Sequence, residues 1–157
     1  MFLRAINTIK VFSILAFLFM ILWVYAYLHE QVRFFMPGNP DHFIMLSKNS
    51  FFYIQLISFA VINLFLYWYS YFLKTGFGDR NASDRMDRKA LRSVYITWFG
   101  GFHFAVNLQL LGILYFSGFQ NINNHAEPYQ YSFFLVTGGI ITIICLVGIL
   151  ITFIRRS

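Results

Sequence analysis

The stretch VFSILAFLFMILWVYAYL, residues 11–28, contains no charged side chain, no proline and no glycine. About 20 residues of α-helix span the hydrocarbon of a bilayer, and a helix that begins near Ala5 reaches that length. The run lacks the alternation of a barrel strand, and backbone polar groups in lipid must be satisfied within the segment. The stretch therefore predicts a transmembrane helix over residues 5–28.

Three further apolar runs follow, over residues 51–73, 94–119 and 133–154. Of the 157 residues, 59% are hydrophobic and 11% are charged, whereas a soluble domain carries roughly 25% charged residues. That much apolar surface does not fit inside one small soluble core. We predict an all-α membrane protein in which residues 1–157 form a single four-helix transmembrane domain.

The first run follows two basic residues, Arg4 and Lys10, as a signal peptide would. It is longer than the usual apolar region of 7–15 residues, and its end, VYAYLHE, offers no cleavage site of small residues. We therefore expect a retained signal anchor.

The basic residues predict the orientation of the helices. Lysine and arginine in short loops mark the cytoplasmic side. Ten of the twelve would lie on the side of the two termini, against only Arg33 and Lys48 on the other; the ten are Arg4, Lys10, Lys74, Arg80, Arg85, Arg88, Lys89, Arg92, Arg155 and Arg156. This bias predicts a multi-pass protein with both termini in the cytoplasm. It also explains the net charge of +6 without a nucleic-acid partner.

A few polar residues interrupt the predicted helices, although no Asp, Glu, Lys or Arg falls in the middle of a span. Pumps, ion-coupled transporters and voltage sensors usually need such a charge. His103 and Asn107 share one face of the third helix, and Gln55 and Asn63 lie in the second. We expect them to form hydrogen bonds between helices. The alternative is that His103 contacts haem or quinone, although a b-type haem usually needs a second histidine at matching depth.

Small residues form a stripe on the fourth helix at spacings of three and four: Gly138, Thr142, Cys145 and Gly148. Such a stripe lets the backbone of another helix approach closely. We expect these positions to accept alanine or serine but not leucine. The spacing leaves open whether the approaching helix belongs to this chain or to a partner.

Motifs of soluble chemistry are absent from the sequence: CxxC, HExxH, the P-loop and GxSxG. We therefore expect no catalytic residues, no metal and no cofactor, and we do not expect an enzyme.

The connection after the first helix, RFFMPGNPDHFIMLSKNSFF, spans residues 33–52. Residues before proline avoid the helical region, and Pro37–Gly38 favours the centre of a type II turn. Ser47 or Ser50 can cap the second helix, and residues 43–46 are apolar enough to lie in the membrane interface. We expect a rigid turn that lies against the membrane.

Four residues of this connection, Gly38, Pro40, Asp41 and Lys48, carry a resemblance to known proteins. The segment GNPDHFIMLSK resembles a pattern in a family of small bacterial membrane proteins of unknown function. The same pattern occurs in the N-terminal domain of membrane immunity proteins against a sporulation-delaying peptide toxin. The resemblance covers residues 32–48 and the flanking helices, about a third of the chain. Arg33 stands where a histidine is usual, and Phe35 replaces an asparagine.

The resemblance implies a protein of the bacterial cytoplasmic (inner) membrane with no established catalytic activity. With the other observations, it favours an accessory or scaffold subunit that packs against other membrane protein subunits within the lipid bilayer. Two alternatives stay open. One is a redox subunit that contacts haem or quinone through His103, and the other is an immunity-like or signalling protein that binds a peptide through the outer loop.

Overall fold

The computed structural model describes residues 2–36, 39–75, 85–122 and 129–154. In chain order the elements are α1 (Phe2–Tyr27), β1 (Gln31–Met36), β2 (Asn39–Ser47), α2 (Lys48–Thr75), α3 (Arg85–Ile122) and α4 (Tyr129–Ile154). The prediction of four helices is confirmed, and α1, α2 and α3 are each long and apolar enough to cross a membrane. Among the described residues of α4, the apolar stretch Val136–Thr152 is shorter.

The helices extend beyond most of the predicted boundaries. The largest difference is in α3, which begins at Arg85 instead of residue 94. Hydropathy places a boundary where the apolar run begins, whereas arginine, lysine, methionine and alanine are good helix formers that continue the helix outside it. The first two turns of α3 are therefore charged, and the apolar span begins at Ser93.

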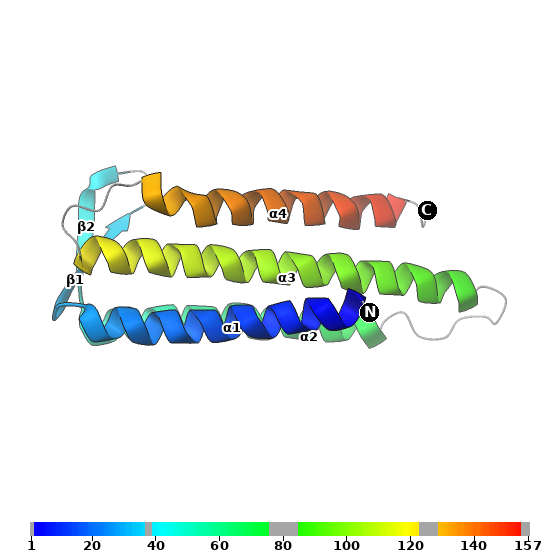
Figure 1. The fold of residues 1–157 in the computed structure, drawn as a ribbon, viewed down its shortest axis with the longest axis horizontal. Helices are drawn as coiled ribbons and strands as arrows, with labels where there is room; N and C mark the ends of the chain where they lie inside the picture. Colours follow the sequence, from blue (N-terminus) through cyan, green and yellow to red (C-terminus); the bar gives the residue numbers. More distant parts are fainter. Residues whose placement is uncertain (1, 37–38, 76–84, 123–128, 155–157) are drawn as a thin grey trace.

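The central helix of the molecule is α3. Figure 1 shows it between α4 on one side and α1 and α2 on the other. It contacts all three other helices, whereas α4 contacts only α3 within the part of the chain that the structure describes. The four helices therefore form an open arrangement instead of a closed bundle.

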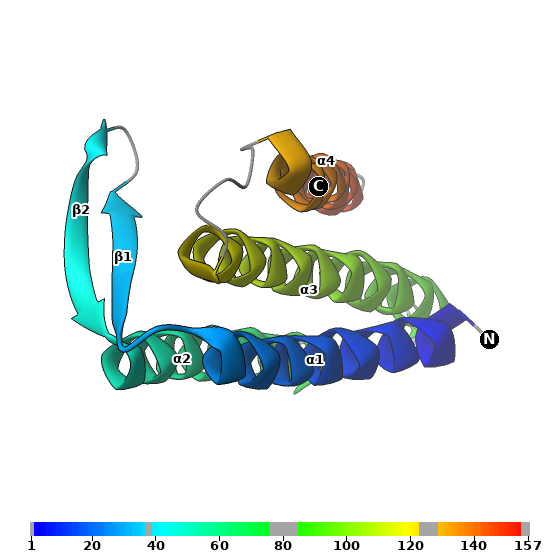
Figure 2. The same ribbon diagram turned by 60° about the vertical axis from the view of Figure 1, so that its left-hand side comes forward.

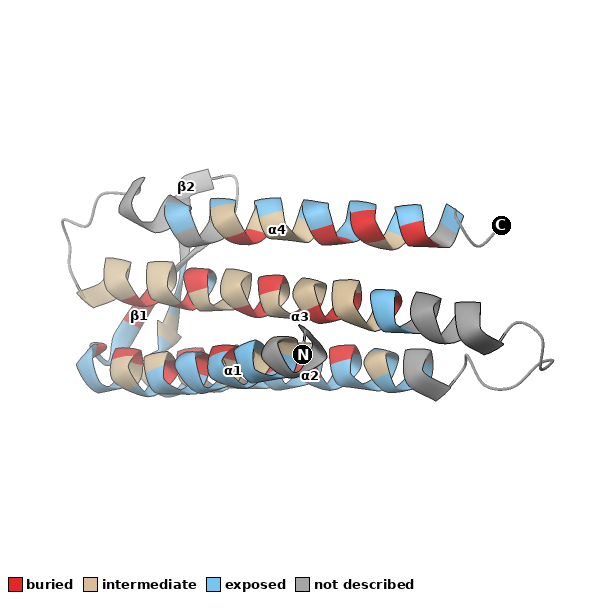
Figure 3. Cartoon of the chain, turned by 45° about the vertical axis from the view of Figure 1, so that its right-hand side comes forward, coloured by how far each residue is buried: buried red, intermediate tan, exposed pale blue. Residues whose placement is uncertain are grey.

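Close packing joins α1 to its two neighbours. The rings of Phe17 on α1 and Phe59 on α2 stack with their centroids 3.8 Å apart. On α3, Gly100 faces Ile6 and Gly118 faces Val24, so closely that a Cβ at either glycine would overlap the facing side chain. Dispersion contacts of this kind hold helices together in lipid, where the hydrophobic effect supplies little. The outer faces of α1, α2 and α4 stay exposed (Figure 3).

The connection between α1 and α2 is a β-hairpin. Its antiparallel register runs from Gln31 opposite Ser47 to Phe35 opposite Phe43, with an irregularity after Phe35. The all-α prediction is wrong for this segment. Aromatic and β-branched residues favour strands, and the two apolar halves of this connection pair with each other. Of the predicted turn, Pro37 and Gly38 lie outside the described residues.

The hairpin lies across one end of the helices, as Figure 2 shows. Asn121, near the end of α3, binds the backbone of Arg33 twice: Oδ1 accepts from the N–H at 2.7 Å and Nδ2 donates to the carbonyl at 2.9 Å. Ser47 Oγ accepts the N–H of Ser50 at 3.1 Å, so Ser47 is the N-cap of α2. These bonds attach both strands to helices.

Candidate functional site

A buried polar cluster lies where α1, α2 and α3 meet. It consists of Ser13 on α1, Asn63 on α2, and His103 and Asn107 on α3. His103 and Asn107 are completely buried. Their four-residue spacing places both on one face of α3, and that face is covered by α1 and α2. Gln55 is also buried, two helical turns before Asn63 on α2.

A hydrogen bond between the side chains of His103 and Asn63 links α3 to α2. Asn63 Nδ2 donates to the carbonyl of Phe59 at 3.0 Å, which leaves Oδ1 as the acceptor. Oδ1 lies 2.8 Å from His103 Nε2. Because an amide oxygen only accepts, the proton of the imidazole is on Nε2. The other ring nitrogen, Nδ1, then carries a lone pair.

Asn107 forms the corresponding bond between α3 and α1. Its Nδ2 donates to Ser13 Oγ at 3.0 Å, and this hydroxyl donates to the carbonyl of Lys10 at 2.7 Å. Two residues one turn apart on α3 therefore bind two different helices. Hydrogen bonds of this kind fix the rotation and depth of helices that apolar packing alone would leave less specific.

The cluster still contains two buried polar atoms, His103 Nδ1 and Asn107 Oδ1, that have no hydrogen-bond partner among the described residues. Both are acceptors, so a ligand that reaches either atom must donate a hydrogen bond to it. A quinone carbonyl needs a donor, and the ring's Nε2–H is directed at Asn63 instead. A haem iron at Nε2 would displace Asn63. Among the described residues, no group of three or more His, Cys, Asp or Glu lies close enough together to hold a metal ion.

The small-residue stripe of α4 lies against α3 of the same chain. Gly148 faces the indole of Trp98, and a Cβ added to Gly148 would overlap that ring. A Cβ added to Gly138 would lie 2.7 Å from Gln109 Cγ, and one added to Gly101 would lie 2.9 Å from Cys145 Sγ. Thr142 Oγ1 donates to the carbonyl of Gly138 at 2.8 Å within α4.

One detail of this interface contradicts what the sequence led us to expect, and another adds to it. Alanine does not fit at Gly148 unless Trp98 moves, contrary to the expectation that alanine is accepted. The residues of α3 that face this stripe were not predicted. They recur at spacings of three and four, as those of α4 do: Trp98, Gly101, Ala105 and Gln109. This matching period was the signal that could have identified α3 as the partner.

The described outer-loop residues belong to two elements at one end of the helices. Pro40 and Asp41 lie in β2, Lys48 is the first residue of α2, and Gly38 lies outside the described residues. Lys48 Nζ lies 4.6 Å from the ring centroid of Tyr25 on α1, and the Tyr25 hydroxyl donates to Asn49 Oδ1 at 2.8 Å. Lys48 and Asn49 thus attach the start of α2 to the end of α1. Asn121, which binds the hairpin, was not among the predicted residues.

In comparisons with known proteins, no protein-family model matches the chain, and neither does any curated protein or solved structure. The resemblance of the outer loop to immunity proteins therefore stays a prediction.

Proposed function

We propose that this chain is a non-enzymatic accessory or scaffold subunit of the bacterial inner membrane, with both termini in the cytoplasm, that packs against a larger membrane complex. The observation that carries the proposal is the open arrangement of helices. Among the described residues α4 contacts only α3, so the four helices do not close around one common interior. Their sides are available to other subunits as well as to lipid.

The outer face of α2 is the surface that best suits a protein partner. Only 22% of the most apolar stretch is buried in α2, the same share as in α1, against 39% in α3. Exposed side chains on α2 recur at helical spacing and are largely aromatic: Val61, Leu64, Phe65, Trp68, Tyr71 and Phe72. Large aromatic side chains dominate the energy of protein interfaces. The proposal therefore places the partner subunit against this face.

Photo-crosslinking in the native membrane tests this proposal. A photoreactive amino acid at Leu64, which is 69% exposed, is expected to capture one defined membrane subunit. The matched control is Leu150 on the outer side of α4, which is 59% exposed. Capture at Leu64 but not at Leu150 supports the proposal. If neither position captures protein and the chain purifies alone in mild detergent, the scaffold role is wrong.

A second candidate, peptide binding through the hairpin, is favoured by the open edge of β2. Arg33 directs its N–H and carbonyl toward Asn121, and therefore away from β2. Met45, its partner in the register, must then direct its own backbone groups to the opposite edge. An extended peptide adds to such an edge by main-chain hydrogen bonds.

Proline substitution tests the edge of β2. Met45→Pro removes an outward N–H and is expected to abolish binding of extracytoplasmic peptides while the hairpin persists. Ile44→Pro is the contrast, because the N–H of Ile44 faces β1 and its loss disrupts the hairpin itself. Peptide binding that survives Met45→Pro would show that the edge is not used.

A further inference from the structure

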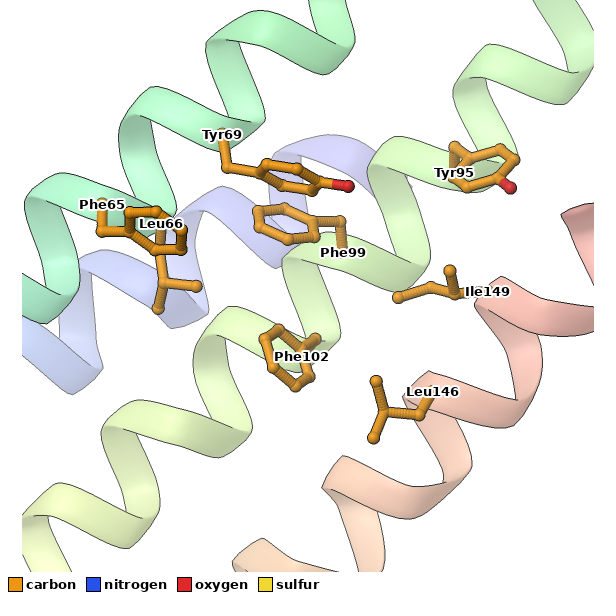
Figure 4. Close-up of a pocket in the computed structure, with 8 residues that line it drawn as sticks. All are labelled: Phe65, Leu66, Tyr69, Tyr95, Phe99, Phe102, Leu146 and Ile149. Atoms are coloured by element: carbon orange, nitrogen blue, oxygen red, sulfur yellow. The ribbon is translucent and has the colours of Figure 1, made fainter.

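A groove runs along α3 between α2 and α4. Figure 4 shows its lining, which includes Phe65 and Tyr69 from α2, Phe99 and Phe102 from α3, and Leu146 and Ile149 from α4. Its volume is about 280 Å³. Because no contact joins α2 to α4 in the part of the chain that the structure describes, the groove opens sideways, toward the surroundings of the helices.

The face of α3 that lines the groove has arginines at its positions nearer the start of the helix. Tyr95, Phe99 and Phe102 line the groove at spacings of four and three. The same alternation continues toward the start of α3 through Arg92, Arg88 and Arg85. At 100° per residue, positions 88 to 102 of this series fall within an arc of about 80°. The nearest acidic residue in α3, Asp87, lies about 100° around the helix from Arg88.

We propose that this groove binds one acyl chain of an anionic phospholipid, whose phosphate lies at the level of the arginines. The charge pattern decides in favour of this occupant. An apolar groove on a helix face whose earlier positions are arginines matches a molecule with an apolar chain and a negative headgroup. Guanidinium groups bind phosphate oxygens in pairs, which a point charge does not.

The dimensions of the groove agree with one lipid chain. Seven residues separate Tyr95 from Phe102, a rise of about 10.5 Å, and one leaflet contributes about 15 Å of hydrocarbon. A transmembrane helix is about 10–12 Å wide with its side chains and does not fit a groove of about 280 Å³. Sites for larger rigid ligands occupy roughly 300–1,000 Å³. A flexible acyl chain does not need a groove of that volume, because part of the chain can extend from the groove into the bilayer.

Native mass spectrometry of the purified protein in mild detergent tests the proposal. Dioleoyl-phosphatidylglycerol and dioleoyl-phosphatidylcholine share their chains and differ in headgroup charge. The wild type is expected to bind the former at least tenfold more tightly. Arg88→Gln with Arg92→Gln is expected to remove most of this preference, since each basic residue near an anionic surface contributes about a fivefold effect.

Two further variants test whether the anionic lipid binds in the groove or is attracted only by the overall positive charge of the protein. Lys74→Gln with Lys89→Gln removes the same charge, but Lys74 lies about half a turn around α2 from Phe65 and Lys89 lies about 100° from Arg88. This variant should keep the preference. Leu146→Trp fills the groove from an exposed position on α4 and should weaken binding of both lipids.

Three outcomes would overturn the proposal. The first is an equal loss of preference in both double variants. The second is unchanged lipid binding in Leu146→Trp. The third is a dimer that Leu146→Trp dissociates, which would assign the groove to a second copy of the chain.

Discussion

The hydrogen bond between His103 and Asn63 is buried from water and lipid, so its loss leaves a polar atom without a partner. His103→Leu is therefore expected to lower the free energy of unfolding by about 1–3 kcal/mol. His103→Gln should cost less, because an amide still donates to Asn63. In a double-mutant cycle with Asn63→Leu, the coupling should be about 0.6–1.7 kcal/mol. Unfolding in mixed micelles measures these values.

Two results would contradict this structural role for His103. One is a cycle in which the two leucine substitutions are additive. The other is a visible absorption band in the wild-type protein that His103→Gln removes, which would identify His103 as a cofactor ligand.

Gly148 on α4 faces the indole of Trp98 on α3, with no room between them for an added Cβ. Gly148→Ala is expected to destabilise the protein by about 1–3 kcal/mol, the usual cost of overpacking, because the new methyl group overlaps the indole. Trp98→Phe should restore part of that loss, since the smaller ring leaves room. Thermal unfolding in detergent of the two single variants and the double variant measures this. Simple additivity would mean that Trp98 is not what limits the space at Gly148.

At the scale of elements, the attachment of the hairpin depends on Asn121. Asn121→Ala removes both bonds to Arg33, together with the bond from Asn121 Nδ2 to the carbonyl of Ser117 within α3. Amide hydrogen exchange in β1 is therefore expected to accelerate by about tenfold, because each lost hydrogen bond contributes about 0.5–1.5 kcal/mol. Ser117→Ala is the control: its hydroxyl donates only within α3, to Ile113. Equal exchange in both variants would show that the hairpin is held by its other contacts.

The same elements show what the sequence could and could not predict. Apolar length predicted the helices, because a backbone in lipid has few alternatives. The hairpin was missed because residues 43–46 are uniformly apolar and lack the alternation that marks a strand. The spacing of His103 and Asn107 identified one face of α3. It could not assign their partners, because Asn63 lies 40 positions and Ser13 lies 94 positions away in the sequence.

At the scale of the whole molecule, the ends of the helices fall into two groups. The start of α1, the end of α2, the start of α3 and the end of α4 lie together, and the hairpin lies at the opposite end (Figure 1). Within the described segments, most basic residues belong to the first end, and Arg33 and Lys48 belong to the second. A bilayer that follows the rule for basic loops places the first end in the cytoplasm.

Cysteine labelling tests this orientation in a Cys145→Ala background, which removes the chain's one natural cysteine. Asn81→Cys lies between α2 and α3 in the sequence, and Asn124→Cys lies between α3 and α4. With intact cells, an impermeant thiol reagent is expected to label Asn124→Cys from outside and to reach Asn81→Cys only after the membrane is opened. Labelling in the reverse order would show that the protein has the opposite orientation in the membrane. It would also place the arginines of α3 in the outer leaflet, away from the cytoplasmic leaflet whose anionic lipids give the surface its negative potential.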